Sequence, residues 1–223
     1  MNPFYFGITC LMKTALLTLS NWRVTGQELV PPGPLVIASN HTSYIDPPLL
    51  CASIPRRIVW MAKQEVFDDS ISGPMARAFG AFPIKRGAGD LKAFRTALYI
   101  LEKGLALGMF PEGERVRNGQ MRRGYPGTVF LAIKSGVPVL PVGIVGTDRL
   151  QTRREIFLQP TIEVNIGPPF MLPQLNGAFT RSDLVVLSDL LMTRIASLLP
   201  KRYQGIYKEP VVDTNSLVEL RVS

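Results

Sequence analysis

Histidine and cysteine are scarce in this sequence. Its 223 residues include one histidine, His41, and two cysteines, Cys10 and Cys51. The cysteines form neither a Cys-x-x-Cys pair nor the spacing of a zinc site, so the sequence predicts no metal centre and no dithiol redox centre. A single disulfide between them is one alternative, but two reduced thiols in a cytosolic protein are the simpler interpretation.

The usual signals of nucleic-acid binding are also missing, although the chain is basic. Lys and Arg total 25 against 17 Asp and Glu, which gives a formal net charge of +8. No zinc-finger spacing, RNA-binding aromatic motif or solvated basic tail accompanies this charge, so we expect no nucleic-acid partner. An anionic lipid surface or a phosphorylated substrate is a better match for the excess of cations.

An apolar stretch runs from Phe4 to Leu19. A helix over it would be about 24 Å long, which is shorter than the roughly 30 Å hydrocarbon core of a bilayer, and Lys13 falls in its middle. It lacks the preceding basic segment of a signal peptide. We therefore expect residues 1–22 to form a helix at the membrane interface, with packing onto the protein's own core as the alternative.

The rest of the chain lacks repeats and low-complexity tracts, and alternates strand-like with helix-like segments. This pattern predicts one α/β domain over residues 23–203, with a largely buried mixed sheet flanked by helices, and a tail over residues 204–223. The expected strands are Leu35–Ser39, Arg57–Ala62, Leu105–Phe110, Val137–Ile144 and Thr161–Ile166. Three helices are expected. One begins after the cap Asp90 and ends at Gly104, and the other two span Pro126–Gly136 and Ser182–Pro200.

The solitary histidine directly follows the first of these strands. His41 and Asp46 are five positions apart, so they would diverge on a regular helix but can meet in a turn that leads into one. There the carboxylate would orient the imidazole and stabilise the imidazolium that forms when His41 accepts a proton. The alternative is structural, because Asp46 followed by Pro47 is also a good helix N-cap.

Two other segments carry chemistry of their own. Lys85 and Arg86 precede Gly87 in an expected loop, where the two cations can bind a phosphate. Glu112 and Gly113 form a Pro-Glu-Gly turn after a strand, where the carboxylate can accept a hydrogen bond from a substrate hydroxyl and the glycine allows a ligand to approach the backbone. A solvated loop and an ordinary turn are the respective alternatives.

Taken together, these segments resemble the glycerolipid acyltransferase superfamily, of the 1-acylglycerol-3-phosphate O-acyltransferase (lysophosphatidic acid acyltransferase) type. Its four ordered blocks match NHTSYIDP, FPIKRG, FPEGER and VPVLPVGI, between Asn40 and Ile144. The third block departs from the family pattern, since Glu114 replaces a small hydroxyl residue while Arg115 is retained. The departure leaves the effect on acceptor binding open.

The resemblance implies a role for each matched residue. His41 would be the general base and Asp46 its orienting partner, and Lys63 would lie near the reacting centre and support the oxyanion. Lys85, Arg86 and Gly87 would bind the acceptor phosphate, and Glu112, Gly113 and Arg115 would position the acceptor. The cosubstrate would be an acyl-CoA or acyl carrier protein thioester, and the acceptor would be lysophosphatidic acid. No metal or cofactor would be required. The chain would act at the cytoplasmic face of a membrane, as a peripheral or monotopic protein.

Several alternatives stay open. The acceptor could instead be glycerol-3-phosphate, a lysophospholipid with a head group, or an amino-lipid. The chain could also be a catalytically silent membrane-binding module of the same fold. A covalent acyl-enzyme is disfavoured, because the sequence has no Gly-x-Ser-x-Gly elbow and neither cysteine lies in the four blocks.

Overall fold

The computed structural model describes residues 3–70, 72–85, 90–116, 118–150, 155, 158–173 and 180–209. Two of the expected phosphate-binding residues, Arg86 and Gly87, lie outside these ranges, as do residues 210–223 of the expected tail.

A mixed sheet of seven strands forms the centre of the described domain, in the order β1-β7-β6-β2-β5-β3-β4. Neighbouring strands are parallel except for β6 and β7, which are antiparallel. The predicted α/β fold with a mixed sheet is therefore confirmed. The strands are β1 (Asn21–Thr25), β2 (Leu35–Ser39), β3 (Ile58–Lys63), β4 (Phe82–Ile84), β5 (Ala106–Met109), β6 (Val139–Val145) and β7 (Thr161–Ile166).

The five expected strands are all present, but β1 and β4 were not predicted from the sequence. Both lie at edges of the sheet. β1 is only half-buried along its length, and β4 is three residues long with a proline in its middle. Such strands lack the apolar run of a buried strand. Backbone pairing with the neighbouring strand, rather than an apolar sequence pattern, identifies them.

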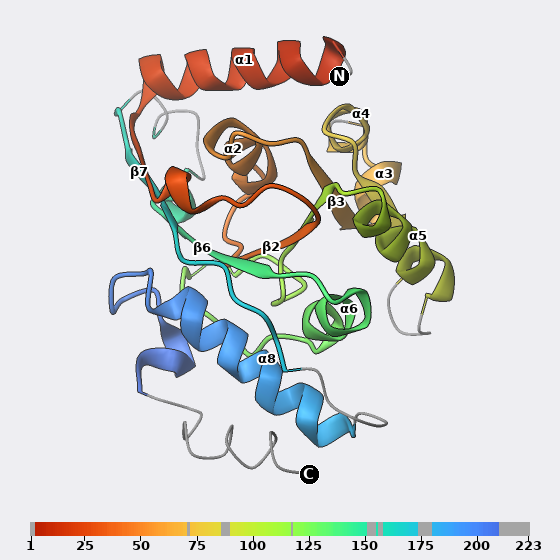
Figure 1. Ribbon diagram of the computed structural model, residues 1–223. Helices are drawn as coiled ribbons and strands as arrows, with labels where there is room; N and C mark the ends of the chain where they lie inside the picture. The colour runs from red at the N-terminus through yellow and green to blue at the C-terminus, as the bar shows by residue number, and fades with distance from the viewer. Residues whose placement is uncertain are drawn as a thin grey trace.

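Helices cover both faces of the sheet (Figure 1). In chain order they are α1 (Pro3–Leu19), α2 (Asp46–Ser53), α3 (Gln64–Asp68), α4 (Ser72–Ala78), α5 (Leu91–Glu102), α6 (Gly127–Ser135) and α8 (Arg181–Ala196), with short 3-10 helices η1 (Gln27–Leu29), η2 (Thr147–Arg149) and η3 (Gly205–Lys208). Two predicted helix ends are confirmed by their geometry. Asp90 accepts the backbone N–H of Ala93 at 3.0 Å, and Gly136 ends α6 with a positive φ of 63°.

The two faces of the sheet have separate hydrophobic cores. In β2, Leu35 and Ile37 point into the core beneath α1 and α2, while Val36 and Ala38 point into the core shared with α5, α6 and α8. All four side chains are fully buried. Burial on both faces explains why β2 is a continuous apolar run rather than an alternating one.

Helix α1 lies across the outside of α2 (Figure 1). Its inner face packs on the domain through Tyr5 and Leu16, while Phe6, Leu11 and Leu17 are 55%, 69% and 69% exposed on its outside. The alternative of packing onto the core is therefore present on one side of the helix, and binding of its exposed apolar side to a membrane remains a prediction. No helix among the described residues is long and apolar enough to cross a membrane.

The start of the expected C-terminal tail packs against α8. Tyr207 of η3 is buried and donates a hydrogen bond to Oδ1 of Asp189 at 2.7 Å. The predicted boundaries at residues 22 and 203 remain predictions, although the segment Gly205–Lys208 contributes to the core of the domain.

Candidate active site

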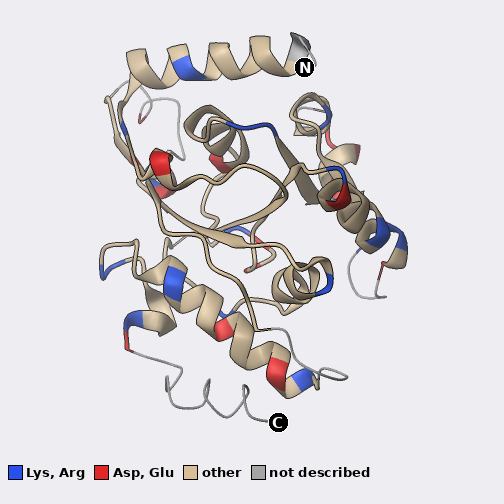
Figure 2. Ribbon diagram, viewed as in Figure 1, with Lys and Arg blue, Asp and Glu red and all other residues tan. Residues whose placement is uncertain are grey.

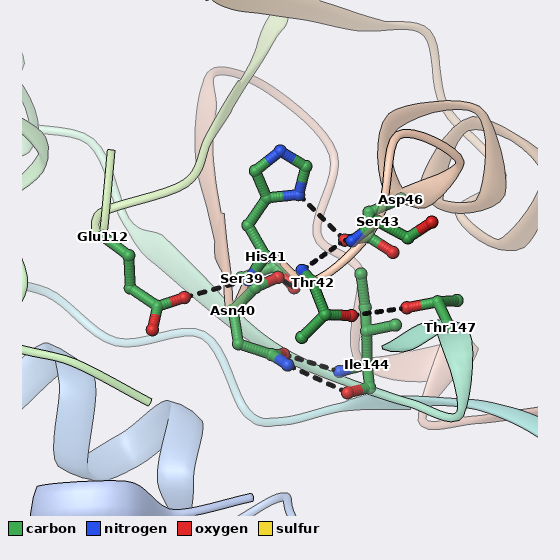
Figure 3. Close-up of polar contacts among 9 residues, drawn as sticks. All are labelled: Ser39, Asn40, His41, Thr42, Ser43, Asp46, Glu112, Ile144 and Thr147. Carbon is green, nitrogen blue, oxygen red and sulfur yellow. Dashed lines mark hydrogen bonds and ion pairs between the residues drawn. The ribbon is translucent and has the colours of Figure 1, made fainter. Parts of the chain in front are cut away.

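The central parallel strands end at a common edge, where the predicted site assembles. His41 follows β2, Glu112 follows β5 and Thr147 follows β6, and β2 pairs with both of the other strands. The loops at the carboxyl ends of adjacent parallel strands therefore meet, as they do at the ligand sites of many α/β proteins (Figure 3).

His41 and Asp46 are in direct contact. Nδ1 of His41 lies 2.8 Å from Oδ2 of Asp46, and the same oxygen accepts the backbone N–H groups of Thr42 and Ser43 at 2.7 and 2.8 Å. Asp46 is fully buried, whereas the His41 side chain is 15% exposed. The carboxylate thus anchors the whole turn that carries the histidine, and the predicted meeting of these two side chains is present.

The hydrogen bond also selects the tautomer of the imidazole. In the neutral imidazole, a hydrogen bond donated from Nδ1 to the Asp46 carboxylate places the proton on Nδ1 and leaves the lone pair on Nε2. Nε2 lies on the side of the ring that faces away from Asp46 (Figure 3), and it has no hydrogen-bond partner among the described residues. His41 therefore has the arrangement of a general base held for proton transfer.

The alternative structural interpretation of Asp46 is wrong. The N-cap position of α2 is Ile45, and Asp46 is already the first helical residue, ahead of Pro47. The Asp46 side chain turns back toward the preceding loop instead of capping α2, because three N–H donors converge on it there.

Glu112 joins the loop after β5 to the histidine loop. Its Oε2 accepts the backbone N–H of His41 at 3.0 Å, and its Oε1 accepts the backbone N–H of Arg122 at 2.8 Å. The side chain is 3% exposed. Burial raises the pKa of Glu112 to about 7, against the two backbone hydrogen bonds, which lower it.

The same loop holds His41 from its other side. The backbone N–H of Val116 donates to the carbonyl of His41 at 2.7 Å, and Gly113 turns the chain with a positive φ of 71°. Both backbone hydrogen-bonding groups of His41 are thus fixed by residues of one loop. Contact of Glu112 and Gly113 with the acceptor remains a prediction.

Asn40 and Thr147 belong to the site and were not singled out from the sequence. The Asn40 side chain donates to the carbonyl of Ile144 at 2.9 Å and accepts its N–H at 2.8 Å, so it extends the pairing of β2 with β6 by one step. Oγ1 of Thr42 lies 2.7 Å from Oγ1 of Thr147. A polar residue directly after a fully buried strand is a signal for Asn40, but Thr147 had none.

Two aromatic residues stack in series from the histidine and were missed. The Phe110 ring stacks on the His41 ring with centroids 4.0 Å apart, and the Trp60 ring stacks on Phe110 at 5.0 Å. Trp60 had been assigned only to a strand, and Phe110 to a strand and to the block FPEGER without a role of its own. Aromatic side chains in apolar segments are expected in cores, so the sequence had no reason to place them beside His41.

The predicted basic residues lie around this edge without touching the histidine. Lys63 ends β3 in register with Ile84 of β4, directly before Lys85. The Lys63 side chain has no ion pair in the described part of the chain, and Lys85 is exposed. The Arg115 guanidinium lies 3.2 Å above the centre of the Tyr44 ring, and Glu114 forms an exposed ion pair with Arg122 at 3.2 Å.

Neither cysteine resembles a nucleophile. Cys51 is buried beneath the sheet, where its Sγ accepts a hydrogen bond from Nε1 of Trp60 at 3.2 Å. Burial raises the pKa of the Cys51 thiol to about 11, and Cys10 is exposed on α1. Across the described ranges, no group of three or more His, Cys, Asp or Glu is arranged to hold a metal ion.

Comparison with known proteins places this site in a family. The family model described as Acyltransferase matches residues 21–145, from β1 to the end of β6. The chain belongs to the acyltransferase family. The match includes His41, Asp46, Glu112 and the strand that follows them, so the resemblance inferred from the four sequence blocks is confirmed.

Individual acyltransferases resemble the chain to different extents. The 1-acyl-sn-glycerol-3-phosphate acyltransferase of Bacillus subtilis is 26% identical over 190 residues, which cover 84% of this chain and 92% of that one. The lyso-ornithine lipid O-acyltransferase of Pseudomonas aeruginosa is 36% identical over 124 residues, but these cover 55% of this chain and 46% of that one. The chain spans 38% of a chloroplastic 1-acyl-sn-glycerol-3-phosphate acyltransferase of Brassica napus.

The fold also has a counterpart of known structure. The crystal structure of the 1-acyl-sn-glycerophosphate acyltransferase of Thermotoga maritima aligns with a TM-score of 0.65, covering 98% of this chain and 80% of that one. At 22% sequence identity the match establishes that the acyltransferase fold is shared.

Proposed function

We propose that the chain transfers a fatty acyl group from an acyl thioester to the free hydroxyl of 1-acylglycerol-3-phosphate, forming phosphatidic acid. The observation that carries this proposal is the contact of His41 Nδ1 with the buried Asp46, which leaves Nε2 unengaged at the carboxyl edge of the sheet. The similarity to the Bacillus subtilis enzyme over 92% of its length supports the choice of acceptor.

The reaction follows from the state of the imidazole. Nε2 of His41 takes the proton of the acceptor hydroxyl as the hydroxyl oxygen attacks the thioester carbonyl. The C–O bond forms, the tetrahedral intermediate collapses with cleavage of the C–S bond, and His41 returns the proton to the departing thiolate. Asp46 stabilises the imidazolium between these steps, in the geometry that it already has.

Charges around the edge of the sheet supply the remaining roles. Backbone N–H groups, aided by Lys63 at the end of β3, would stabilise the oxyanion. Lys85 and Arg86 would bind the phosphate of the acceptor, with Gly87 keeping the loop open to it. Glu112, Gly113 and Arg115 would position the acceptor from the loop after β5.

The transfer is direct rather than through an acyl-cysteine. The buried Cys51 has a pKa of about 11, so it is protonated at neutral pH, and a thiol is a far weaker nucleophile than a thiolate. The donor is an acyl-CoA or an acyl carrier protein thioester.

The proposed site of membrane binding is the outer face of α1. Phe6, Leu11 and Leu17 are exposed there, and the only charged residue of this helix is the cation Lys13 (Figure 2). An apolar face with a cation fits the surface of an anionic bilayer, where the acceptor resides, and we place the enzyme at its cytoplasmic face.

A second acceptor has an observation in its favour. The relative from Pseudomonas aeruginosa is a lyso-ornithine lipid O-acyltransferase. Its sequence is 36% identical over an aligned region that covers 55% of this chain. An ornithine head group carries an amino group and a carboxylate but no phosphate, so Lys85 and Arg86 would attract the more highly charged phosphate of lysophosphatidic acid more strongly.

A thiol-release assay separates these functions. Purified protein would receive acyl-CoA with lysophosphatidic acid, glycerol-3-phosphate or lyso-ornithine lipid, with lipid products identified by mass spectrometry. We expect phosphatidic acid as the main product, and no product from His41→Ala. Preferred acylation of lyso-ornithine lipid would replace the proposed acceptor. If none of the three acceptors caused thiol release, the transferase proposal would be overturned.

A further inference from the structure

The imidazole of His41 is the end of a stack of three rings. The Phe110 ring lies 4.0 Å from it with an angle of 15° between planes, and the Trp60 ring lies 5.0 Å beyond Phe110 with an angle of 11°. His41 lies in the loop after β2, Phe110 directly follows β5, and Trp60 lies in the middle of β3. We call these three residues the aromatic stack.

The strands below fix the far end of the aromatic stack. Trp60 is in register with Gly108 on the neighbouring strand, and its indole fills the space above that glycine. A Cβ at position 108 would lie 2.6 Å from two carbons of the indole ring, closer than a real Cβ contact allows. The indole is also held by its hydrogen bond to Sγ of Cys51, so Trp60 has little freedom to move.

The hydrogen bond to Asp46 alone does not define the plane of the imidazole. It fixes the position of Nδ1, but the ring can still pivot about the line from Nδ1 to Oδ2, and such a pivot would move Nε2 away from the acceptor hydroxyl. The face of Phe110 blocks that pivot. An aromatic face also stabilises a cation placed over it, and the imidazolium is a cation.

We infer that Phe110, backed by Trp60 over Gly108, is a positioning residue that sets the plane of the His41 imidazole and stabilises its protonated form during acyl transfer. The inference deepens the proposed function, because it rests on His41 as the base. In this role Phe110 acts through His41 rather than through contact with a substrate.

The solitary histidine allows this arrangement to be measured without any substrate. The carbon-bound ring protons of His41 give the only histidine signals in an NMR spectrum of the chain. Stacking at 4.0 Å shifts such signals upfield through the ring current of Phe110. We expect Phe110→Leu to lose this upfield shift and Phe110→Tyr to keep it, since tyrosine restores the aromatic face.

A matched control comes from the other side of the sheet. Phe130 of α6 is partly buried and packs on Phe94, with ring centroids 5.0 Å apart. Phe130→Leu therefore removes the same ring from a similar setting without touching His41, and it should leave the histidine signals unchanged. Unchanged signals in a folded Phe110→Leu would overturn the inference.

Kinetics give the second measurement. Phe110→Leu should lower kcat about ten- to a hundredfold, because a small misplacement of a base is costly, with both KM values within about twofold of the wild type. Phe110→Tyr should recover most of the loss. Trp60→Phe, which leaves space behind Phe110, should lower kcat by less than Phe110→Leu does and reduce the upfield shift.

The two proposals fail in different ways. A raised KM for either substrate with an unchanged kcat in Phe110→Leu would mean that Phe110 lines a substrate site, and would overturn the positioning role while leaving acyl transfer in place. A wild-type chain that shows the upfield shift but acylates no acceptor would refute the proposed function while the stack itself remained. A Phe110→Leu variant that loses the shift yet keeps the wild-type kcat would refute the positioning role.

Discussion

The carboxylate of Glu112 accepts the backbone N–H of His41 at 3.0 Å, across 71 positions of sequence. Its other oxygen accepts the N–H of Arg122, and the side chain is buried. The acid of the Pro-Glu-Gly turn thus holds the backbone of the histidine loop, and its protonation bears directly on the stability of the site.

Stability should depend on pH through Glu112. Burial raises its pKa from 4.5 to about 7, so between these values the folded state binds more protons than the unfolded state. This contribution is therefore fully present below about pH 4.5 and is lost as pH rises to about 7, by about 3 kcal/mol in total. Urea unfolding at pH 5 and pH 8 measures the difference.

A pair of substitutions isolates that contribution. Glu112→Gln cannot titrate, so its change in unfolding free energy between pH 5 and pH 8 should lack the Glu112 contribution. Glu114→Gln removes an exposed carboxylate from the same loop and should keep the wild-type pH dependence. Equal pH dependence in wild type and Glu112→Gln would exclude Glu112 as its source.

Loss of the charge on Asp46 should disable the base without dismantling the turn. In Asp46→Asn the amide oxygen can still accept the N–H groups of Thr42 and Ser43, while the amide nitrogen takes the place of Oδ1, which has no hydrogen-bond partner in the described residues. The imidazolium loses its charge partner, so kcat should fall by about 10² to 10⁴.

The control for Asp46→Asn is the same change at Asp183. That residue is the N3 member of the capping box of α8, where an amide oxygen can still accept the backbone N–H of Thr180, so kcat should not change. Steady-state kinetics with circular dichroism would measure both variants. An Asp46→Asn enzyme that is folded and within threefold of wild-type kcat would contradict the role of Asp46.

Arg86 should determine the affinity for a phosphorylated acceptor. Arg86→Ala should raise the KM for lysophosphatidic acid about ten- to a hundredfold and leave the KM for acyl-CoA nearly unchanged, because one charged hydrogen bond is lost. Arg95→Ala makes the same change at an exposed position of α5 and should alter neither constant. A matching rise in the KM for acyl-CoA would assign Arg86 to the donor instead.

The outer face of α1 should control binding to anionic vesicles. Deletion of α1 would expose the core around Tyr5 and Leu16, so a surface substitution is the better test. Leu17→Glu should weaken vesicle binding about ten- to a hundredfold, since a buried leucine contributes about 1.5–3 kcal/mol. Raising the salt concentration should also weaken the binding of the wild-type protein to anionic vesicles.

The vesicle experiment also has a matched control. Leu91 of α5 is 69% exposed, as is Leu17, so Leu91→Glu changes the net charge equally at a site away from α1. Cosedimentation of both variants with anionic vesicles compares them directly. Equal weakening by the two substitutions would point to net charge and away from α1.

The local elements of this protein could be predicted from its sequence. Apolar runs between turn residues located the five inner strands, and Asp90 and Gly136 marked helix ends through hydrogen bonds and backbone angles that depend on near neighbours. The contact of His41 with Asp46 was predictable for the same reason, because both lie in one six-residue turn.

How these elements meet depends on contacts between distant parts of the chain. The carboxylate of Asp46 could have capped α2, and the converging N–H groups of the loop decided otherwise. Glu112 beside His41, Asn40 beside Ile144 and Trp60 behind Phe110 depend on which strands pair and in which register. The pairing and register of the strands are set by the burial of both faces of the whole sheet. That burial depends on the complete chain, so it cannot be read from a single segment.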